Sequence, residues 1–294
     1  MPNLNEAEFI AALRSLPLHP GSRGLMDDAA VLEFGGETLV LTHDTMVEGM
    51  HFLPSQDMAD VAWKLVATNL SDLAAKGAQP VGILLSHMLG EDDDRFVSGL
   101  AEVCQHYNVP LLGGDTVSGD GTRVLGCTAI GRATHVPVPA RSGAQIGDHL
   151  YVTGRLGEAM LGFEALRDGT GADSTAYRRP LARMAEGETL APLVTAMMDV
   201  SDGLLLDAFR MADASETSFA IDTAAIPVAD DARRMDCLTW GDDYELLFTL
   251  PADAHPPIPA TRIGSVEPKG FASLFVDGEP VTNPQGLGYR HEAP

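Results

Sequence analysis

The sequence is poor in basic residues, and in lysine above all. Its 294 residues contain 19 Lys and Arg against 42 Asp and Glu, a formal net charge of −23 at pH 7. A charge of this sign repels nucleic acid and anionic membranes, so a protein that binds either is disfavoured. Only three lysines are present, Lys64, Lys76 and Lys269. If the protein handles phosphates, it has few ammonium groups to neutralise them, and metal ions are the obvious substitute.

Cysteines and long apolar runs are also scarce. The three cysteines, Cys104, Cys127 and Cys237, are odd in number and widely spaced, which favours buried reduced thiols over a disulfide framework or a zinc site. No stretch of about 18 apolar residues occurs, and the N-terminal segment lacks the basic start and apolar run of a signal peptide. We therefore expect a cytoplasmic protein with no membrane-spanning segment.

Several common catalytic motifs are missing. The sequence has no Gly-Lys dipeptide and hence no P-loop, no Gly-x-Gly-x-x-Gly at a helix start, no HExxH and no Gly-x-Ser-x-Gly. A lone His51 beside an aromatic residue is more often structural or a ligand contact than a general base. We expect no catalytic nucleophile and no catalytic base.

The hydrophobic pattern predicts an α/β fold of two domains. Helical spacing is found over 5–16, 58–75, 93–107, 157–168, 182–195 and 203–213. Strands are expected over 29–33, 38–43, 81–88, 109–112, 123–133, 149–153, 218–221, 244–249, 261–266 and 272–277. The first half thus has the order β–β–α–β–α–β, with a turn expected at Gly113–Asp115. We interpret the proline-rich stretch 134–148 as the crossover between domains, and 250–294 as a tail that wraps the surface.

Six aspartates stand at the ends of predicted elements, in apolar or glycine-rich surroundings: Asp28, Asp44, Asp72, Asp115, Asp199 and Asp202. A carboxylate in such surroundings needs a partner for its charge, and too few basic residues lie nearby to pair with all six. Mg²⁺ takes carboxylate oxygens and typically bridges to substrate phosphates. A helix cap or an Asx turn remains the alternative for any one of them.

Three local contexts sharpen the metal hypothesis. At Thr42-His43-Asp44 a hydroxyl, a backbone carbonyl and a carboxylate could share one ion. In the segment 111–116, two glycines let the backbone approach a phosphate while Asp115 holds a metal. In the segment 199–203, two aspartates bracket Ser201 at a helix start, where free N–H groups favour an anion.

Seven segments resemble the thiamine-monophosphate kinase family, which belongs to the superfamily of aminoimidazole ribonucleotide synthetase and selenophosphate synthetase. They run in family order and are MDDAAVL (26–32), HDTMVEGMHF (43–52), NLSDLAAKGAQP (69–80), GGDT (113–116), ARSGAQIGD (140–148), DVSDGL (199–204) and GDDYELLFT (241–249). The resemblance implies transfer of the ATP γ-phosphate to thiamine monophosphate, giving thiamine diphosphate and ADP, with several Mg²⁺ ions and no phospho-enzyme. The acceptor is a phosphate oxygen, already deprotonated near pH 7, so a base is unnecessary.

The resemblance also implies roles for individual residues. The implied metal ligands are Asp28, Thr42, the backbone of His43, Asp44, Asp72, Asp115, Asp199 and Asp202. The implied ATP contacts are Gly114, Asp115, Arg141 and Ser201, and the implied thiamine-phosphate contacts are His51, Asp242 and Tyr289. The sequence departs from the family pattern at Met26 (usually glycine), Lys76 (often methionine) and Asp242 (frequently glutamate).

The family's PurM-like architecture is expected as well. It implies an N-terminal domain, residues 1–136, that binds ATP and Mg²⁺ and dimerises through its sheet into a barrel. A C-terminal α/β domain, residues 137–294, would complete the active site of a homodimer. The alternatives are another ATP-dependent synthetase of the superfamily, making aminoimidazole ribonucleotide or selenophosphate, and a non-catalytic protein that binds divalent cations. Selenophosphate synthetases usually carry a reactive Cys near the N-terminus, whereas the first cysteine here is Cys104.

Overall fold

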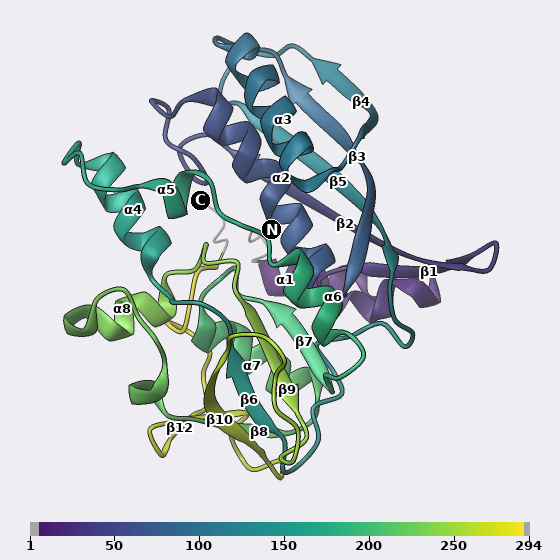
Figure 1. The fold of residues 1–294 in the computed structure, drawn as a ribbon, viewed down its shortest axis with the longest axis vertical. Helices are drawn as coiled ribbons and strands as arrows, with labels where there is room; N and C mark the ends of the chain where they lie inside the picture. The colour runs from purple at the N-terminus through teal and green to yellow at the C-terminus, as the bar shows by residue number, and fades with distance from the viewer. Residues whose placement is uncertain (1–5, 291–294) are drawn as a thin grey trace.

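The computed structural model of the chain describes residues 6–290 and contains two β-sheets, with helices packed on and between them (Figure 1). The first sheet has five strands in the order β1-β2-β5-β3-β4. Their bounds are Ala30–Phe34 (β1), Glu37–Val47 (β2), Ala78–Met88 (β3), Leu111–Val117 (β4) and Val124–Ala133 (β5). All pairs are antiparallel except β3 with β4. The helices of this half are α1 (Glu6–Leu13), the 3-10 helix η1 (Pro20–Leu25), α2 (Met58–Ala75) and α3 (Asp93–Tyr107).

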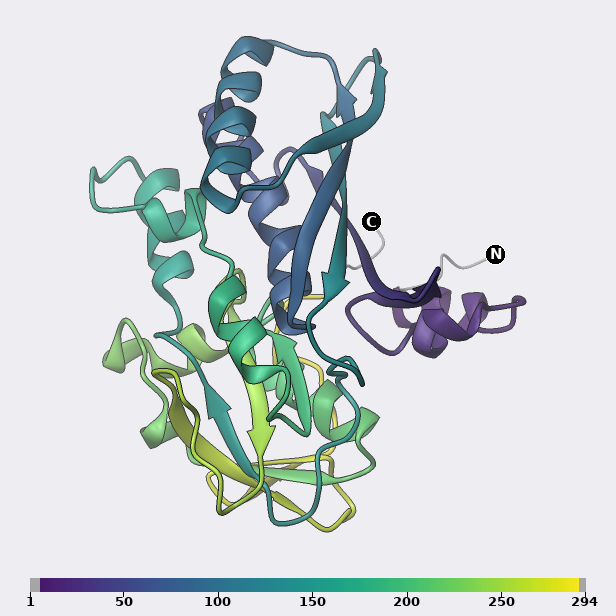
Figure 2. The same ribbon diagram turned by 45° about the vertical axis from the view of Figure 1, so that its right-hand side comes forward.

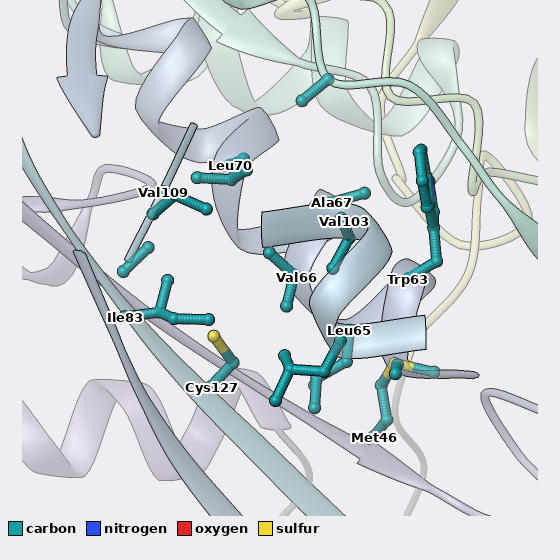
Figure 3. Packing of buried hydrophobic residues seen from close by; sticks show 14 of the residues in the cluster. Met46, Trp63, Leu65, Val66, Ala67, Leu70, Ile83, Val103, Val109 and Cys127 are labelled. Carbon is teal, nitrogen blue, oxygen red and sulfur yellow. The ribbon is translucent and has the colours of Figure 1, made fainter. Parts of the chain in front are cut away.

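The core of the first half lies between α2 and one face of this sheet. In Figure 3 Leu65 and Val66 of α2 point toward Ile83 of β3 and Cys127 of β5. All four side chains are fully buried. Of the 18 residues of α2, only Asp72 is not buried. The helix therefore lies inside the molecule, between the sheet and the rest of the chain.

Within residues 6–290, no helix covers the opposite face of the first sheet at β3 and β4 (Figure 2). Figure 2 shows the helices on one side of these strands and no helix on the other side of their upper part. All seven residues of β4 are exposed. Apolar side chains with more than a third of their surface exposed recur on β3 and β4, at Val81, Leu84, Leu111, Leu112 and Val117. The open face is therefore apolar.

The second sheet has seven strands in the order β12-β11-β8-β10-β6-β9-β7. Their bounds are His149–Val152 (β6), Ala196–Asp199 (β7), Ser218–Ile221 (β8), Leu246–Leu250 (β9), Thr261–Glu267 (β10), Leu274–Val276 (β11) and Glu279–Val281 (β12). The helices of this half are α4 (Glu158–Arg167), α5 (Thr175–Arg178), α6 (Met184–Leu190), α7 (Leu204–Ala214) and α8 (Arg234–Thr239), with short 3-10 helices η2 (Thr223–Ala225) and η3 (Asp231–Arg233). None of the helices in the described part of the chain is long and apolar enough to cross a membrane.

The C-terminal end of α2 joins the two halves. Ala74 and Ala75 pack in one buried cluster with Leu190 of α6, Met197 of β7 and Phe248 of β9. The last turns of α2 therefore lie beside the end of β7.

The mixed α/β fold is confirmed, and so is most of the predicted order of elements. The bounds of α2, α3 and β8 coincide with those predicted. The N-terminal helix is confirmed over Glu6–Leu13, whereas residue 5 lies outside the described residues. The helix predicted over 182–195 is confirmed only over Met184–Leu190 (α6), so its predicted ends were wrong.

Two further expectations are corrected. The turn predicted at Gly113–Asp115 is instead the middle of β4, where Gly113 and Gly114 pair with Leu84 and Leu85 of β3. The segment from residue 250 was expected on the surface, but its strand β10 lies inside the second sheet between β8 and β6. Residues 291–294 lie outside the described part. The helices α5 and α8 and the strands β7 and β12 were not predicted.

Candidate active site

Three predicted ligands from distant parts of the chain converge at the junction of the two halves. One carboxylate oxygen from each of Asp28, Asp72 and Asp199 lies within 4.8 Å of the others. Asp28 follows η1, Asp72 lies in the last turns of α2, and Asp199 ends β7. The hydroxyl of Ser71 donates to Asp199 Oδ2 at 2.6 Å. The packing of α2 against β7 therefore brings these carboxylates together.

The carboxylates of this cluster lie close to one another, with Asp199 buried and Asp28 and Asp72 half-buried. Burial, with a further contribution from the charge of Asp28, raises the pKa of Asp199 to about 7. Burial, together with the charges of Asp28 and Asp202, raises the pKa of Asp44 to about 6. Burial also raises the pKa of Asp72 well above its usual range, and Asp44 and Asp199 add to this effect. Ionising all of them without a cation is therefore costly.

Thr42, His43 and Asp44 lie on β2 beside the cluster. The hydroxyl of Thr42 donates to Asp72, and Asn69 Oδ1 accepts a hydrogen bond of 3.1 Å from the backbone N–H of Asp44. The His43 ring lies on the exposed face of the sheet, 2.8 Å from Thr128 Oγ1. Thr42 and Asp44 thus offer side-chain oxygens to the cluster, and His43 can offer only its backbone.

The carboxylates of the Asp27-Asp28 pair already face protein cations. The Lys76 ammonium lies 2.6 Å from Asp27 Oδ1 and 2.5 Å from Asp28 Oδ2, and Arg141 Nε donates to Asp28 Oδ1 at 2.6 Å. Burial alone would raise the pKa of Asp27, but the charges of Lys76 and Arg23 hold it well below its usual range. Lys76 was not predicted as a site residue, although it is one of only three lysines.

The loop after β7 is ordered by a buried carboxylate, Asp207. Its Oδ2 accepts hydrogen bonds of 3.1 Å from the backbone N–H groups of Ser201 and Asp202. These two N–H groups are therefore not available to bind an anion. The expectation that free N–H groups in the segment 199–203 favour an anion was wrong for these two. Asp202 in turn pairs with Arg210 at 2.5 Å. The site keeps the hydroxyl of Ser201 and the carboxylate of Asp202.

A cavity of about 390 Å³ opens at the cluster. Four acids of the site line it: Asp44, Asp72, Asp199 and Asp202. Its other lining residues include Ser201 and all three predicted substrate contacts, His51, Asp242 and Tyr289. The structure thus brings four of the predicted metal ligands and the three predicted substrate contacts to one cavity.

Part of the remaining wall of the cavity is aromatic, and apart from Tyr289 its aromatic residues were not predicted from the sequence. Phe163 of α4 lies 5.2 Å from Tyr177 of α5 and 5.1 Å from Trp240, measured between ring centroids. Tyr244 and Tyr289 complete the aromatic lining. These residues come from separate helices and loops, so no local spacing in the sequence groups them.

A buried lysine organises this part of the cavity. Lys64 Nζ lies 2.7 Å from Asp242 Oδ2 and donates to the backbone carbonyl of His51 at 3.1 Å. It also lies 3.9 Å from the centroid of the Tyr177 ring. Tyr244 donates to the other Asp242 oxygen at 2.8 Å. Lys64 interrupts an otherwise apolar stretch of α2, which is the sequence signal that could have identified it.

Gly114 and Asp115 are not brought to this cluster within one chain. Asp44 pairs with Cys127 of β5, Cys127 with Leu85 of β3, and Leu85 with Gly114 of β4. Three strand separations amount to about 14 Å. Asp115 follows Gly114 in the strand and therefore points to the opposite, open face. Arg141 reaches Asp28 but does not line the cavity.

The chain matches two family models in succession. The model described as AIR synthase related protein, N-terminal domain, matches residues 26–133. The model of the C-terminal domain of the same family matches residues 145–277.

Curated relatives and solved structures cover nearly the whole chain. The thiamine-monophosphate kinase of Escherichia coli K12 is 37% identical over 92% of this chain and 92% of its own length. That of Caulobacter vibrioides is 36% identical over 97% of this chain and 90% of its own. The solved structure of AaThiL complexed with AMPPCP and TMP superposes with a TM-score of 0.87 at 28% identity, covering 99% of both chains.

Proposed function

Because the chain belongs to the thiamine-monophosphate kinase family of AIR synthase related proteins, we propose that it transfers the γ-phosphate of ATP to thiamine monophosphate. The products are thiamine diphosphate and ADP. The observation that carries this proposal is one cavity that joins a carboxylate cluster to an aromatic pocket. Two relatives named thiamine-monophosphate kinase and the structure of AaThiL complexed with AMPPCP and TMP support it.

The donor set of the cluster suits Mg²⁺. It consists of oxygens only, three carboxylates approach within 4.8 Å, and burial makes their joint ionisation costly without a cation. We propose that Mg²⁺ is held by Asp28, Thr42, the His43 backbone, Asp44, Asp72, Asp199 and Asp202. When bound, Mg²⁺ supplies neutralisation and alignment of the phosphate oxygens.

The chain's own residues have mainly a positioning task. The acceptor is a phosphate oxygen, largely deprotonated at neutral pH, so no side chain has to remove a proton. Arg141, held beside Asp28, and the Ser201 hydroxyl are proposed to contact the ATP phosphates. We propose direct in-line transfer with no covalent enzyme intermediate.

The aromatic part of the cavity suits the thiamine moiety. Thiamine carries an aromatic cation, which aromatic faces attract. His51, Asp242 and Tyr289 line the same cavity and are proposed to contact thiamine monophosphate. Lys64 and Tyr244 hold both oxygens of Asp242, so its carboxylate is fixed in place before the substrate binds.

The open face of the first sheet supports a homodimer. An edge strand with every residue exposed and a row of exposed apolar side chains is seldom left uncovered in solution. We propose that two copies pair through this face into a barrel. Asp115 points to this face and Gly114 precedes it in β4, and we propose that pairing brings them to the phosphates at the partner's cluster. Residues 1–136 would then bind ATP and Mg²⁺ and dimerise, and residues 137–294 would complete the site.

An ADP-release assay tests the proposed function. The purified chain is supplied with ATP and Mg²⁺ and with thiamine monophosphate, unphosphorylated thiamine or another phosphomonoester. We expect ADP release and thiamine diphosphate formation with thiamine monophosphate alone. ADP release that does not depend on thiamine monophosphate would refute the proposal.

A further inference from the structure

A buried lysine lies where the proposed function calls for metal ions. The side chain of Lys76 is completely buried at the C-terminal end of α2. Its ammonium group sits between the carboxylates of Asp27 and Asp28, at 2.6 and 2.5 Å.

All three protons of the Lys76 ammonium have an acceptor. The third acceptor is the backbone carbonyl of Met197, 3.3 Å from Nζ. Met197 lies in β7 two residues before Asp199, and Lys76 itself follows Asp72 by four residues. An ammonium group has three N–H donors, and here each of them has an acceptor. The acceptors belong to the loop that carries Asp28 and to the strand that carries Asp199, which are two of the proposed metal ligands. These three acceptors form a binding site for a cation.

The charges of the site divide into two groups. Each oxygen of Asp28 faces a protein cation, Arg141 on Oδ1 and Lys76 on Oδ2. By contrast, within residues 6–290 no Lys or Arg nitrogen lies within 4.0 Å of the carboxylates of Asp72 or Asp199, which receive hydrogen bonds only from neutral hydroxyls. One part of the site is thus neutralised by the chain itself, and the other part is left for external cations.

We propose that Lys76 is a resident cation of this site, which occupies a position between Asp27 and Asp28 that a divalent ion would otherwise take. The proposal rests on the proposed function, because that function assigns Asp28 to the metal site. It has two consequences. The chain binds one divalent ion fewer than it would with a neutral side chain at position 76, and the Asp28 end of the cluster stays in place when no divalent ion is bound.

The test counts ions in the absence of nucleotide and thiamine phosphate. Mn²⁺ binding to the full chain is measured by electron paramagnetic resonance of the free ion, for the parent and for Lys76→Met. Methionine is unbranched like lysine, is one atom shorter and carries no charge. We expect Lys76→Met to bind one more Mn²⁺ per chain than the parent, and Mg²⁺ to raise its thermal midpoint more. An Mn²⁺ count equal to the parent's would overturn the proposal.

A matched control removes a cation from another carboxylate. Arg179→Met deprives the buried Asp60 of one of its two arginine partners. Asp60 lies twelve residues before Asp72 in α2, which corresponds to about 18 Å along the helix axis. A lysine that is only structural would behave like this control, with a lower thermal midpoint and the parent's ion count. If Lys76→Met does not fold, Lys76→Gln takes its place, because glutamine is also uncharged and keeps N–H donors for the carboxylates. An Mn²⁺ count equal to the parent's in that variant overturns the proposal.

The outcome is independent of the kinase assignment. Neither the ion count nor the thermal midpoint requires turnover, so both can support Lys76 as a cation even if no ADP is released. Conversely, a chain that phosphorylates thiamine monophosphate but shows no additional ion in Lys76→Met keeps its proposed function and loses this inference.

Discussion

Replacing Asp199 by asparagine should inactivate the chain and stabilise it. Asp199 is almost fully buried, and burial beside Asp28 raises its pKa to about 7 from a usual value of 3.8. Asparagine has nearly the same shape, and its Oδ1 can still accept the 2.6 Å hydrogen bond from Ser71. The substitution therefore removes a buried negative charge and leaves the packing in place.

The size of the effect depends on pH. A carboxyl group whose pKa is higher in the folded chain favours folding below its unfolded pKa, and this contribution is lost as pH rises through the folded pKa. The difference between 3.8 and about 7, at about 1.4 kcal/mol per pKa unit, corresponds to about 4 kcal/mol at pH 8. The variant does not suffer this loss. At roughly 2 °C per kcal/mol for a chain of this size, its thermal midpoint should lie about 8 °C above the parent's.

Thermal unfolding without divalent ions, at pH 4.5 and at pH 8, measures this effect. We expect Asp199→Asn to melt near the parent at pH 4.5 and well above it at pH 8. Mg²⁺ should raise the midpoint of the parent more than that of the variant, and ADP release by the variant should be lost. Asp231→Asn is the control, since Asp231 is 83% exposed and should show no such pH dependence. A variant that melts at or below the parent at pH 8 would refute the buried-charge reasoning.

Three further predictions concern the proposed substrate pocket and dimer. Tyr289→Ala should raise KM for thiamine monophosphate more than KM for ATP in steady-state assays; equal increases would remove Tyr289 from the substrate pocket. Leu112→Glu places a charge on the open face and should yield monomers in sedimentation experiments, whereas an unchanged mass would exclude this face as the dimer contact. Asp44→Asn and Asp115→Asn should each abolish turnover with the fold retained. An equal mixture of the two variants after subunit exchange should recover about a quarter of parental activity, because half of the dimers then hold one intact site out of two. No recovery would place Asp115 in its own chain's site.

The helices and strands that were predicted well are those whose ends are marked by a local signal in the sequence. The limits of α2 were correct because the signals at its ends are local: Asp57 accepts from the N–H of Ala59 at the start, and Gly77 has a φ of +57° just beyond the end. Gly113–Asp115 was misassigned because glycine also serves close packing. A Cβ on Gly114 would lie 1.9 Å from the Leu85 carbonyl oxygen, so this glycine permits the approach of β4 to β3. The position of β10 inside the sheet depends on its partners, which no local pattern encodes.

Residues of the candidate site could be predicted where they stand at the ends of predicted helices and strands or in the segments that resemble the kinase family. The aspartates at element ends were expected to converge, and Asp28, Asp72 and Asp199 do so. The aromatic wall was not expected, because Phe163, Tyr177 and Trp240 lie in weakly patterned segments and meet only through tertiary packing.

Helix α2 relates the two ends of the site to each other. Its buried lysines lie twelve residues apart, which corresponds to about 18 Å along a helix axis. Lys64 holds Asp242 at the aromatic pocket, and Lys76, just past the end of α2, holds Asp28 beside Arg141. Asp72 lies between them, about 6 Å from the Lys76 end. If thiamine monophosphate binds at the Lys64 end and ATP at the Lys76 end, their reacting phosphates meet beside Asp72. One rigid, buried helix then fixes the distance between donor and acceptor, which is the main task that phosphoryl transfer leaves to a protein.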